Sequence, residues 1–296
     1  MGVIFSPGYT PYVQETGSLL METGEFLLLE SGDQILLDLK VGDDYPINNA
    51  RIAHSRNWGT PAFTFPSSTE VGYFAEAPNN TLTYERWKPA AMPADWRVTF
   101  SSTIAMDYCC IAAHTMGTNG NTLAIQYWNG SVWVDLITPT AITDDSDIFV
   151  IFPEMTQEEV RILISDGTAP EIGVVKFGSA LQLERPLYGG HSPILFARRT
   201  VLKTNESETG EYLGVSKYRT YLESTFSWQN LSASWIRSKW DILQRAIETE
   251  PFFIAWRPGS YDEVAFGRAT SVPIPTNMGR RDLMSVELAM RARSYD

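Results

Sequence analysis

The sequence predicts an all-β protein in which a β-sandwich is joined to a β-rich lobe carrying one amphipathic helix. Short apolar runs separated by Gly, Pro, Asn and Asp recur about every ten residues between 47 and 187, which is typical of a sandwich. Aromatic residues make up 12% of the chain and include nine Trp, a composition that suits half-buried strands. Only one segment, near 232–249, spaces its apolar residues as a helix does.

The first segment, 1–46, carries a short repeat of an acidic residue, Thr or Ser, and Gly, followed by apolar residues. Gly permits a tight turn, and the apolar residues give each short strand a side to bury. Strands this short cannot bury that side alone. We therefore predict an ordered β arm over 15–39 that packs on another domain or subunit, the alternative being a flexible acidic leader. The proposed contact residues in this arm are Leu27, Leu29 and Leu36.

The second segment, 47–187, is predicted to be the sandwich. Asn129 and Gly130 stand between two runs of aromatic and β-branched residues, a pattern that favours a two-residue type I′ hairpin. Further strands are predicted at 98–106, 148–152 and 160–164.

The third segment, 188–296, begins after a Pro- and Gly-rich cluster at 185–193, which marks a boundary. Ser232 or Ser234 can cap the predicted helix, and Pro251 ends it. The remaining apolar runs predict strands at 194–202, 218–228, 252–256, 264–268 and 282–291.

Charge and cysteine content exclude several classes of function. Acidic residues outnumber basic ones by 35 to 23, so the chain repels phosphate backbones and nucleic-acid binding is not expected. Cys109 and Cys110 are adjacent, which favours two reduced thiols over a disulfide framework or a cysteine metal site. The N-terminus does not resemble a secretory signal, and apolar runs are too short for membrane insertion. We therefore expect synthesis in a cytoplasm.

Motifs for catalysis are not found. The sequence lacks a nucleophile elbow, a P-loop and a dinucleotide fingerprint, and its three histidines are far apart. We expect no catalytic residue and no cofactor, although carboxylate pairs keep a glycosidase open as a remote alternative. The acidic run containing Asp144, Asp145 and Asp147 is interpreted as a solvated loop. Calcium binding is its alternative, because clustered oxygens suit that ion, but the spacing of an EF-hand is missing.

Three segments resemble the galactose-binding-like (discoidin, or coagulation factor 5/8 type) jelly-roll family. The hairpin at 126–134 turns through Asn-Gly and returns with a Trp, 159–164 resembles the penultimate core strand, and 174–178 the closing strand. The resemblance covers about 50–184 and implies a jelly roll, with a possible glycan site on the loops at one end. An exposed aromatic would stack on the sugar while polar groups grip its hydroxyls. The candidates are His54, Arg56, Trp58, Tyr84 and Trp87.

The repeat in the first segment and the runs at 250–258 and 263–267 are similar to bacteriophage distal-tail and tail-tip (baseplate) proteins. This resemblance implies a non-enzymatic virion component that forms a symmetric homo-oligomer and contacts other tail proteins and host-surface carbohydrate. Trp256 and Phe266 would then pack the core of the lobe or fill a groove on another subunit. A receptor-binding carbohydrate adhesin is the main alternative, ahead of a polysaccharide-degrading enzyme.

Overall fold

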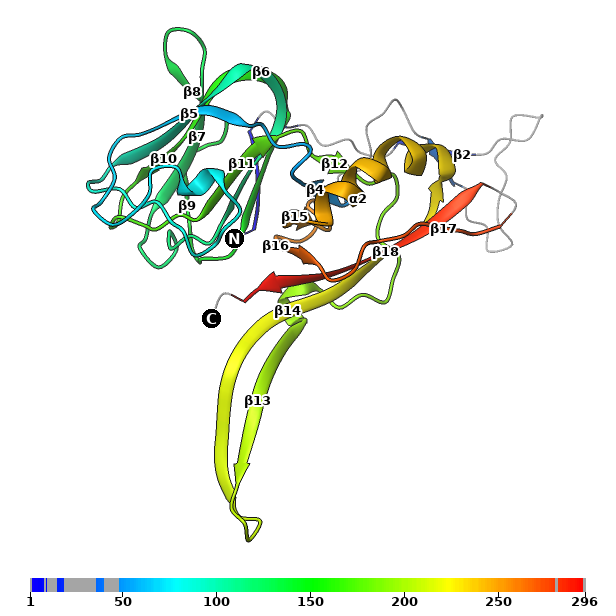
Figure 1. Ribbon diagram of the computed structural model, residues 1–296. Helices are drawn as coiled ribbons and strands as arrows, with labels where there is room; N and C mark the ends of the chain where they lie inside the picture. The colour runs from blue at the N-terminus through cyan, green and yellow to red at the C-terminus, as the bar shows by residue number, and fades with distance from the viewer. Residues whose placement is uncertain are drawn as a thin grey trace, which may run out of the picture.

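The computed structural model describes residues 2–7, 9, 15–18, 36–39, 48–279 and 282–294. It consists of a β-sandwich, a second lobe in which a helix lies on a sheet, and a two-stranded arm that projects from that lobe (Figure 1). The predicted all-β class is confirmed. No helix in the described ranges has the length and apolar character needed to cross a membrane.

The sandwich contains the following strands and one short 3₁₀ turn: β1 (Val3–Phe5), β5 (Pro61–Pro66), η1 (Ala77–Asn79), β6 (Ala94–Ala112), β7 (Thr122–Trp128), β8 (Trp133–Asp135), β9 (Thr140–Ala141), β10 (Ile148–Ser165) and β11 (Val174–Gly178). The predicted closing strand at 174–178 coincides with β11.

Strands β6 and β10 are long, and they pair along most of their lengths, from Ala94 opposite Ile164 to Ile111 opposite Ile148. Two register shifts interrupt this pairing near the middle of β10, where both strands bend. Each strand therefore contributes one half to each layer. The segments 148–152 and 160–164, predicted as separate strands, are the two ends of β10.

We call the two layers the outer and the inner layer. The outer layer contains β5, the first half of β6, the second half of β10, β7, β8 and β9. The inner layer contains β11, the second half of β6, the first half of β10, and β1, which pairs with β10 in parallel. Alternate residues of these strands meet between the layers and form a fully buried apolar core that includes Trp96, Phe100, Ile125, Phe152 and Ile162.

The second lobe is one sheet in the order β12 (Leu181–Gln182), β4 (Arg51–Ala53), β15 (Phe252–Ala255), β16 (Val264–Ala269), β18 (Leu283–Arg293), β14 (Tyr212–Ser232) and β13 (Arg198–Glu206), with β17 (Thr276–Asn277) beside β18. A 3₁₀ turn, η2 (Ile194–Phe196), precedes β13. Strands β4 and β12 belong to this sheet although both lie inside the segment predicted as the sandwich. The chain thus pairs with the second lobe as it enters and as it leaves the sandwich.

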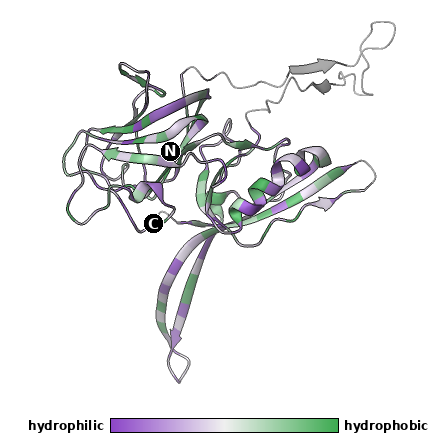
Figure 2. Cartoon of the chain, turned by 45° about the horizontal axis from the view of Figure 1, so that its top comes forward, coloured by the Kyte–Doolittle hydropathy of each residue, from purple (hydrophilic) through white to green (hydrophobic). Residues whose placement is uncertain are grey.

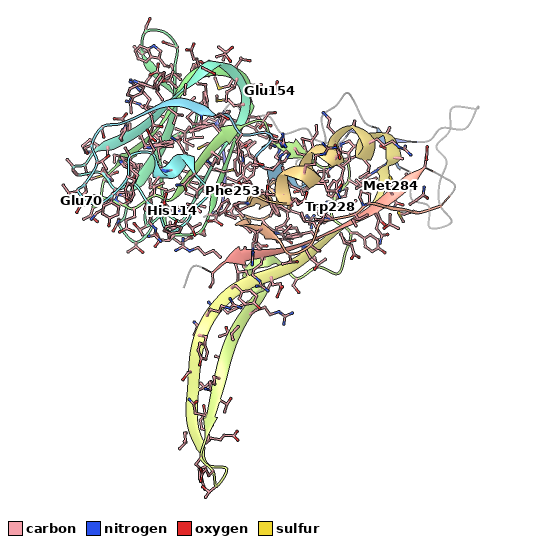
Figure 3. The ribbon with its side chains drawn as sticks, viewed as in Figure 1. Glu70, His114, Glu154, Trp228, Phe253 and Met284 are labelled. Carbon is pink, nitrogen blue, oxygen red and sulfur yellow. The ribbon has the colours of Figure 1, made fainter. Side chains whose placement is uncertain are left out.

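The predicted helix is a continuous helical run of α1 (Ala233–Trp235), a π turn η3 (Ile236–Trp240) and α2 (Asp241–Ile247). Ser232 caps it, because its Oγ accepts a hydrogen bond from the Trp235 amide at 3.3 Å. Trp235 and Trp240 pack the helix on the sheet next to Trp228. Trp228 and Met284 lie in this lobe in Figure 3.

The turn between β7 and β8 differs from the predicted type I′ hairpin. Trp128 pairs with Trp133, so the loop has four residues rather than two. Gly130 has a φ of +94°, but Asn129 is not among the residues with positive φ. Asn129 instead accepts hydrogen bonds through Oδ1 from the amides of Ser131 and Val132, both at 2.9 Å. This side-chain turn replaces the left-handed backbone that a type I′ turn requires.

A third apolar cluster joins the two bodies. The outward side chains of the inner layer, among them Tyr108 and Phe149, pack against Phe253 and Phe266 from β15 and β16. Figure 3 places Phe253 between the sandwich and the second lobe. Phe266 therefore lies within the chain's own core, and Trp256 is buried in the core of the second lobe. Of the two roles offered for Trp256 and Phe266, packing in the core is the one that the structure supports. Filling a groove on another subunit is wrong, because both rings are buried against residues of their own chain.

The arm is formed by β13 and the first half of β14, which pair from Arg198 opposite Leu222 to Glu206 opposite Tyr212. Most of its residues are exposed on both faces. Figure 2 shows apolar residues among hydrophilic ones along its length. The other arm, predicted at 15–39, is described only where β2 (Glu15–Ser18) pairs with β3 (Leu36–Leu39). Leu27 and Leu29, and the side chain of Leu36, lie outside the described residues.

Candidate functional site

The bend of β6 and β10 brings four connections to one end of the sandwich, namely 67–93, 113–121, 142–147 and 166–173. Figure 3 shows Glu154 at the bend, with Glu70 and His114 at the opposite end. Direct contacts link these loops. The Thr118 amide donates to Asp145 Oδ1 at 3.0 Å, and Asn121 Nδ2 donates to the carbonyl of Asp166 at 2.8 Å. We call this region the loop end.

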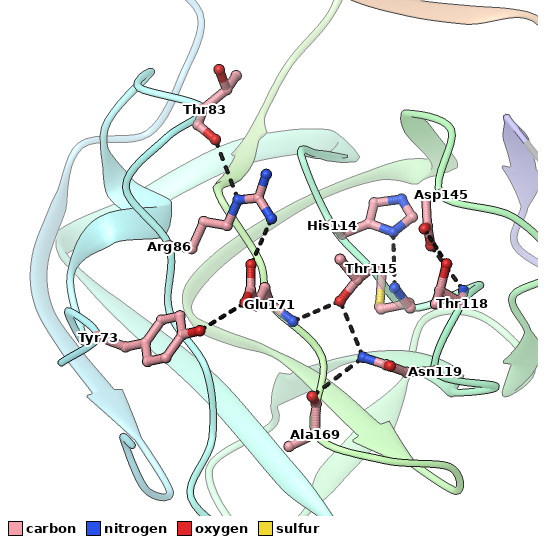
Figure 4. Close-up of polar contacts among 11 residues, drawn as sticks. Tyr73, Thr83, Arg86, His114, Thr115, Thr118, Asn119, Asp145, Ala169 and Glu171 are labelled. Carbon is pink, nitrogen blue, oxygen red and sulfur yellow. Dashed lines mark hydrogen bonds and ion pairs between the residues drawn. The ribbon is translucent and has the colours of Figure 1, made fainter. Parts of the chain in front are cut away.

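A polar network at the loop end centres on Glu171 (Figure 4). Tyr73 Oη donates to Glu171 Oε1 at 2.7 Å, and Arg86 Nη1 donates to Oε2 at 2.6 Å. Arg86 Nε also reaches the carbonyl of Thr83 at 3.4 Å. The Glu171 amide donates to Thr115 Oγ1 at 2.9 Å. The loop at 67–93 therefore holds the Glu171 carboxylate, and the loop at 113–121 holds the Glu171 backbone.

The network is charged and remains open to solvent. The hydrogen bond from Tyr73, with help from Arg86, lowers the pKa of the Glu171 carboxyl below its ordinary value. The same hydrogen bond raises the pKa of Tyr73. Beside it, Lys88 Nζ lies 2.8 Å from Glu70 Oε2 and 5.5 Å from the centroid of the Tyr73 ring. Arg86 and Glu171 are half-buried, so each keeps hydrogen-bonding capacity for an external group.

Two aromatic side chains stand exposed on the same loop. Phe74 is 64% exposed and Tyr84 is 75% exposed. The Phe74 amide donates to the Arg86 carbonyl at 3.3 Å, which ties one of these residues to the network. Tyr84 stands two positions before Arg86 in the sequence. Exposed rings and fixed hydrogen-bonding groups on one loop are a composition that can hold a small polar molecule with an apolar face.

Two of the predicted glycan-binding residues are buried, and their assignment is wrong. Trp87 is 0% exposed, and its Nε1 donates to the Ser68 carbonyl at 2.9 Å inside the sandwich core. His54 is also buried, and its Nδ1 accepts from the Arg56 amide at 3.2 Å. Burial lowers the pKa of His54 to about 4, so the ring is neutral at pH 7. Neither ring can stack on a sugar.

The other predicted glycan-binding residues do not form one site. Arg56 is exposed, whereas Trp58 is half-buried and forms a β-bridge with Gly178 at the end of β11. Trp87 forms its bridge with Ile172, before the start of that strand. Of the five candidates, only Tyr84 combines high exposure with a place on the loop that also carries Tyr73 and Arg86.

The candidate calcium ligands separate in the structure. Asp147 is buried, and its Oδ2 accepts from the Phe266 amide at 2.6 Å, so it faces the second lobe. Asp145 accepts from Thr118, and Asp144 Oδ1 accepts from the Ser146 amide at 3.0 Å. Across the described ranges, no three His, Cys, Asp or Glu side chains gather as metal ligands.

Sequence reasoning missed Tyr73, Arg86 and Glu171. Tyr73 and Arg86 lie 98 and 85 positions from Glu171, so no local motif joins them. They meet because the bend in β6 and β10 brings the loops that carry them to the same end of the sandwich.

No known protein family and no curated sequence matches the chain. Similar solved structures include the family 32 carbohydrate-binding module of C. perfringens NanJ in complex with galactose, at 16% identity and a TM-score of 0.35, covering 41% of this chain and 97% of that one. Another is a chitosan-binding module of a chitosanase/glucanase from Paenibacillus sp. IK-5, at 16% identity and a TM-score of 0.34, covering 40% and 95%. A pectin-binding module shows 13% identity and a TM-score of 0.36, covering 40% and 91%. Likenesses of this size do not establish a ligand for this chain.

Proposed function

We propose that this protein binds carbohydrate through the loop end of its sandwich and catalyses no reaction. The observation that carries the proposal is the fixed Tyr73–Arg86–Glu171 network, open to solvent, on a loop that also carries the exposed rings of Phe74 and Tyr84. A pyranose ring presents an apolar face that stacks on an aromatic ring, and its hydroxyls both donate and accept hydrogen bonds. Glu171 can accept from such hydroxyls, and Arg86 can donate to them.

Pre-organisation supports the proposal. Binding is weakened by the entropy lost when side chains are ordered, and that loss is smaller where they are already held. Both carboxylate oxygens of Glu171 already have partners, and Arg86 is held at two of its nitrogens. The network therefore offers a rigid set of polar groups to a ligand.

The test is a glycan array probed with the purified chain, followed by calorimetry on the best ligand. Tyr84→Ala and Glu171→Gln should each weaken binding at least tenfold. Tyr218→Ala, at an exposed tyrosine of the arm, is the matched control and should bind as the unaltered protein does. Arrays blank for every neutral and acidic glycan, or binding that survives both substitutions, would overturn the proposal.

A second candidate function is a structural component of a bacteriophage tail tip, located in the virion and forming a symmetric assembly with itself and other tail proteins. The observation that favours it is the projecting arm. A two-stranded ribbon is marginally stable in water, and this one exposes large apolar residues including Leu202, Tyr212 and Leu213. Such a surface suits a protein partner. The tip sequence ETGEYL at 208–213 also repeats ETGEFL at 22–27, with Tyr in place of Phe.

Oligomeric state tests this second candidate. Replacing both Tyr212 and Leu213 with Ser should convert an oligomer into monomer in sedimentation velocity, with no change in glycan binding. An unaltered chain that sediments as a monomer at high concentration and never copurifies with phage tails would contradict the structural role. That result would leave carbohydrate binding standing.

A further inference from the structure

The outward surface of the outer layer forms a second surface of binding character, which we call the platform. The second lobe covers the outward side of the inner layer. In Figure 1, β7 and β8 of the outer layer lie farther from that lobe than β11 of the inner layer does. Phe63 and Phe65 of β5 are 65% and 46% exposed there, on a strand at the edge of the sheet. Exposed aromatic rings on an edge strand invite aggregation unless they serve a partner.

A row of side chains crosses the platform from β5 to β8. Phe65 is paired with Arg97, Arg97 with Arg161, Arg161 with Gln126, and Gln126 with Asp135. Adjacent strands lie about 4.8 Å apart, so a row over five strands spans roughly 19 Å. This length fits several linked sugar units better than a single one.

Hydrogen bonds and ion pairs fix the row. Arg161 Nε donates to Gln126 Oε1 at 2.7 Å, and Gln126 Nε2 donates to Asp135 Oδ1 at 2.7 Å. Arg97 Nε lies 3.2 Å from Glu159 Oε1, and an Arg161 nitrogen lies 3.7 Å from Asp95 Oδ2. Each arginine is thus neutralised by a carboxylate on the same surface. A platform with internally paired charges suits a neutral ligand better than an ionic one.

Each arginine is also stacked on an aromatic ring near one edge of the platform. The Arg97 guanidinium lies 4.8 Å from the centroid of Phe65, and that of Arg161 lies 4.2 Å from the centroid of Trp133. Trp128 stands beside Trp133 with ring centroids 5.4 Å apart. The platform therefore has aromatic rings at both edges and fixed hydrogen-bonding groups between them.

We propose that the platform binds a neutral polysaccharide segment of several sugar units that lies across the strands. The rings at the two edges stack on sugar faces, and the amide, guanidinium and carboxylate groups between them bond the hydroxyls. The inference rests on the proposed carbohydrate binding and adds a second site to it. The loop end holds one sugar, whereas the platform recognises an extended chain.

The experiment uses the full chain and calorimetry with cellohexaose, chitohexaose and mannohexaose, each beside its monosaccharide. Replacing both Phe63 and Phe65 with Ser should weaken hexasaccharide binding at least tenfold and change monosaccharide binding less than twofold. Trp133→Ala, at the other edge, should do the same. Tyr84→Ala at the loop end should weaken monosaccharide binding, and Tyr218→Ala on the arm is the control.

Failure of the two proposals is distinguishable. Unchanged hexasaccharide binding in both platform variants, with a loss in Tyr84→Ala, overturns the platform and leaves the loop end intact. Losses confined to the platform variants overturn the loop end alone. An unaltered chain that binds none of the six sugars overturns the platform. A dimer that the platform variants convert to monomer in sedimentation also overturns it, because the surface would then be an interface between copies.

Discussion

At the scale of single residues, we expect the burial of ionisable groups to make the stability of this protein depend on pH. Lys176 of β11 is buried, its ammonium donates to the carbonyl of Asn79, and it lies 5.0 Å from the centroid of the Trp58 ring. Burial lowers the pKa of Lys176 from 10.5 to about 8. The charged form therefore destabilises the folded state at neutral pH.

Lys176→Met should raise the free energy of unfolding at pH 7, by at most roughly 3 kcal/mol. Between pH 8 and 10.5 the unfolded state holds more protons at this position than the folded state, so the stability of the unaltered protein should rise with pH in that window. The variant should lack this rise. Urea denaturation at pH 7 and pH 9.5 measures both effects, with the exposed Lys217→Met as control. Parallel stability curves for the unaltered protein and Lys176→Met would contradict the assignment.

His114 should make stability rise with pH in the same direction as Lys176 does, but over an acidic range. Its burial lowers the pKa to about 4 from 6.5, and Nε2 lies 2.7 Å from the carbonyl of Ser146. Between pH 6.5 and 4 only the unfolded state takes up this proton, so stability should fall as the pH falls. His114→Gln should lower the free energy of unfolding at pH 7. It should also make that free energy fall less steeply between pH 6.5 and 4. The two proteins would be compared by urea denaturation at pH 7 and 5; an equally steep loss in the variant would rule His114 out as the cause.

Trp87 separates a core role from a ligand role. Trp87→Ala should cost about 3–5 kcal/mol of folding free energy, because a large buried ring is removed and a cavity remains. The companion variant Tyr84→Ala should change stability by less than about 0.5 kcal/mol, since its ring is exposed. Chemical denaturation measures both. A Trp87 variant of unaltered stability would restore the residue as a surface candidate.

At the scale of elements, local patterns predicted what local physics determines. The strand at 174–178 and the helix near 232–249 follow from apolar spacing and capping, and both are confirmed. The continuity of β10 was not predictable, since the exposed polar residues at its bend interrupt the apolar pattern between its two ends. The Glu171 network was missed for a related reason. Its members meet only after β6 and β10 have bent and the loops have gathered.

The helix cap gives a test at this scale. Ser232 accepts from the Trp235 amide through Oγ, and its own amide and Oγ both contact the Glu184 carboxylate, at 2.7 and 2.9 Å. Ser232→Ala should cost about 1 kcal/mol or somewhat more, because a cap and a partner for Glu184 are lost together. Ser234→Ala, two residues later and exposed, is the control: its Oγ donates to Ser232 Oγ at 3.3 Å but caps no backbone amide. If the two substitutions lower the temperature of thermal unfolding equally, Ser232 does not act as the helix cap.

At the scale of the whole molecule, the outward apolar face of the inner layer is covered by β15 and β16 of the same chain. From the sequence, another polypeptide was the alternative partner for the apolar residues of this lobe. Alternation along β15 explains how the chain covers that face itself. Phe252 points into the core of the second lobe, and Phe253, the next residue, points into the cluster shared with the sandwich. The Phe253 and Phe266 rings are 4.4 Å apart, and the Phe266 amide bonds Asp147 of the sandwich. The two bodies should therefore unfold together.

Phe252→Ala and Phe253→Ala form a matched pair for that expectation, because both rings are fully buried on one strand and face opposite cores. Each should cost about 3–5 kcal/mol. Only Phe253→Ala removes contacts between the bodies, so only it should split a single calorimetric transition into two. Phe252→Ala should shift the transition to lower temperature and leave it single. Two transitions in the unaltered protein would show that the shared cluster is too weak to couple the sandwich to the second lobe.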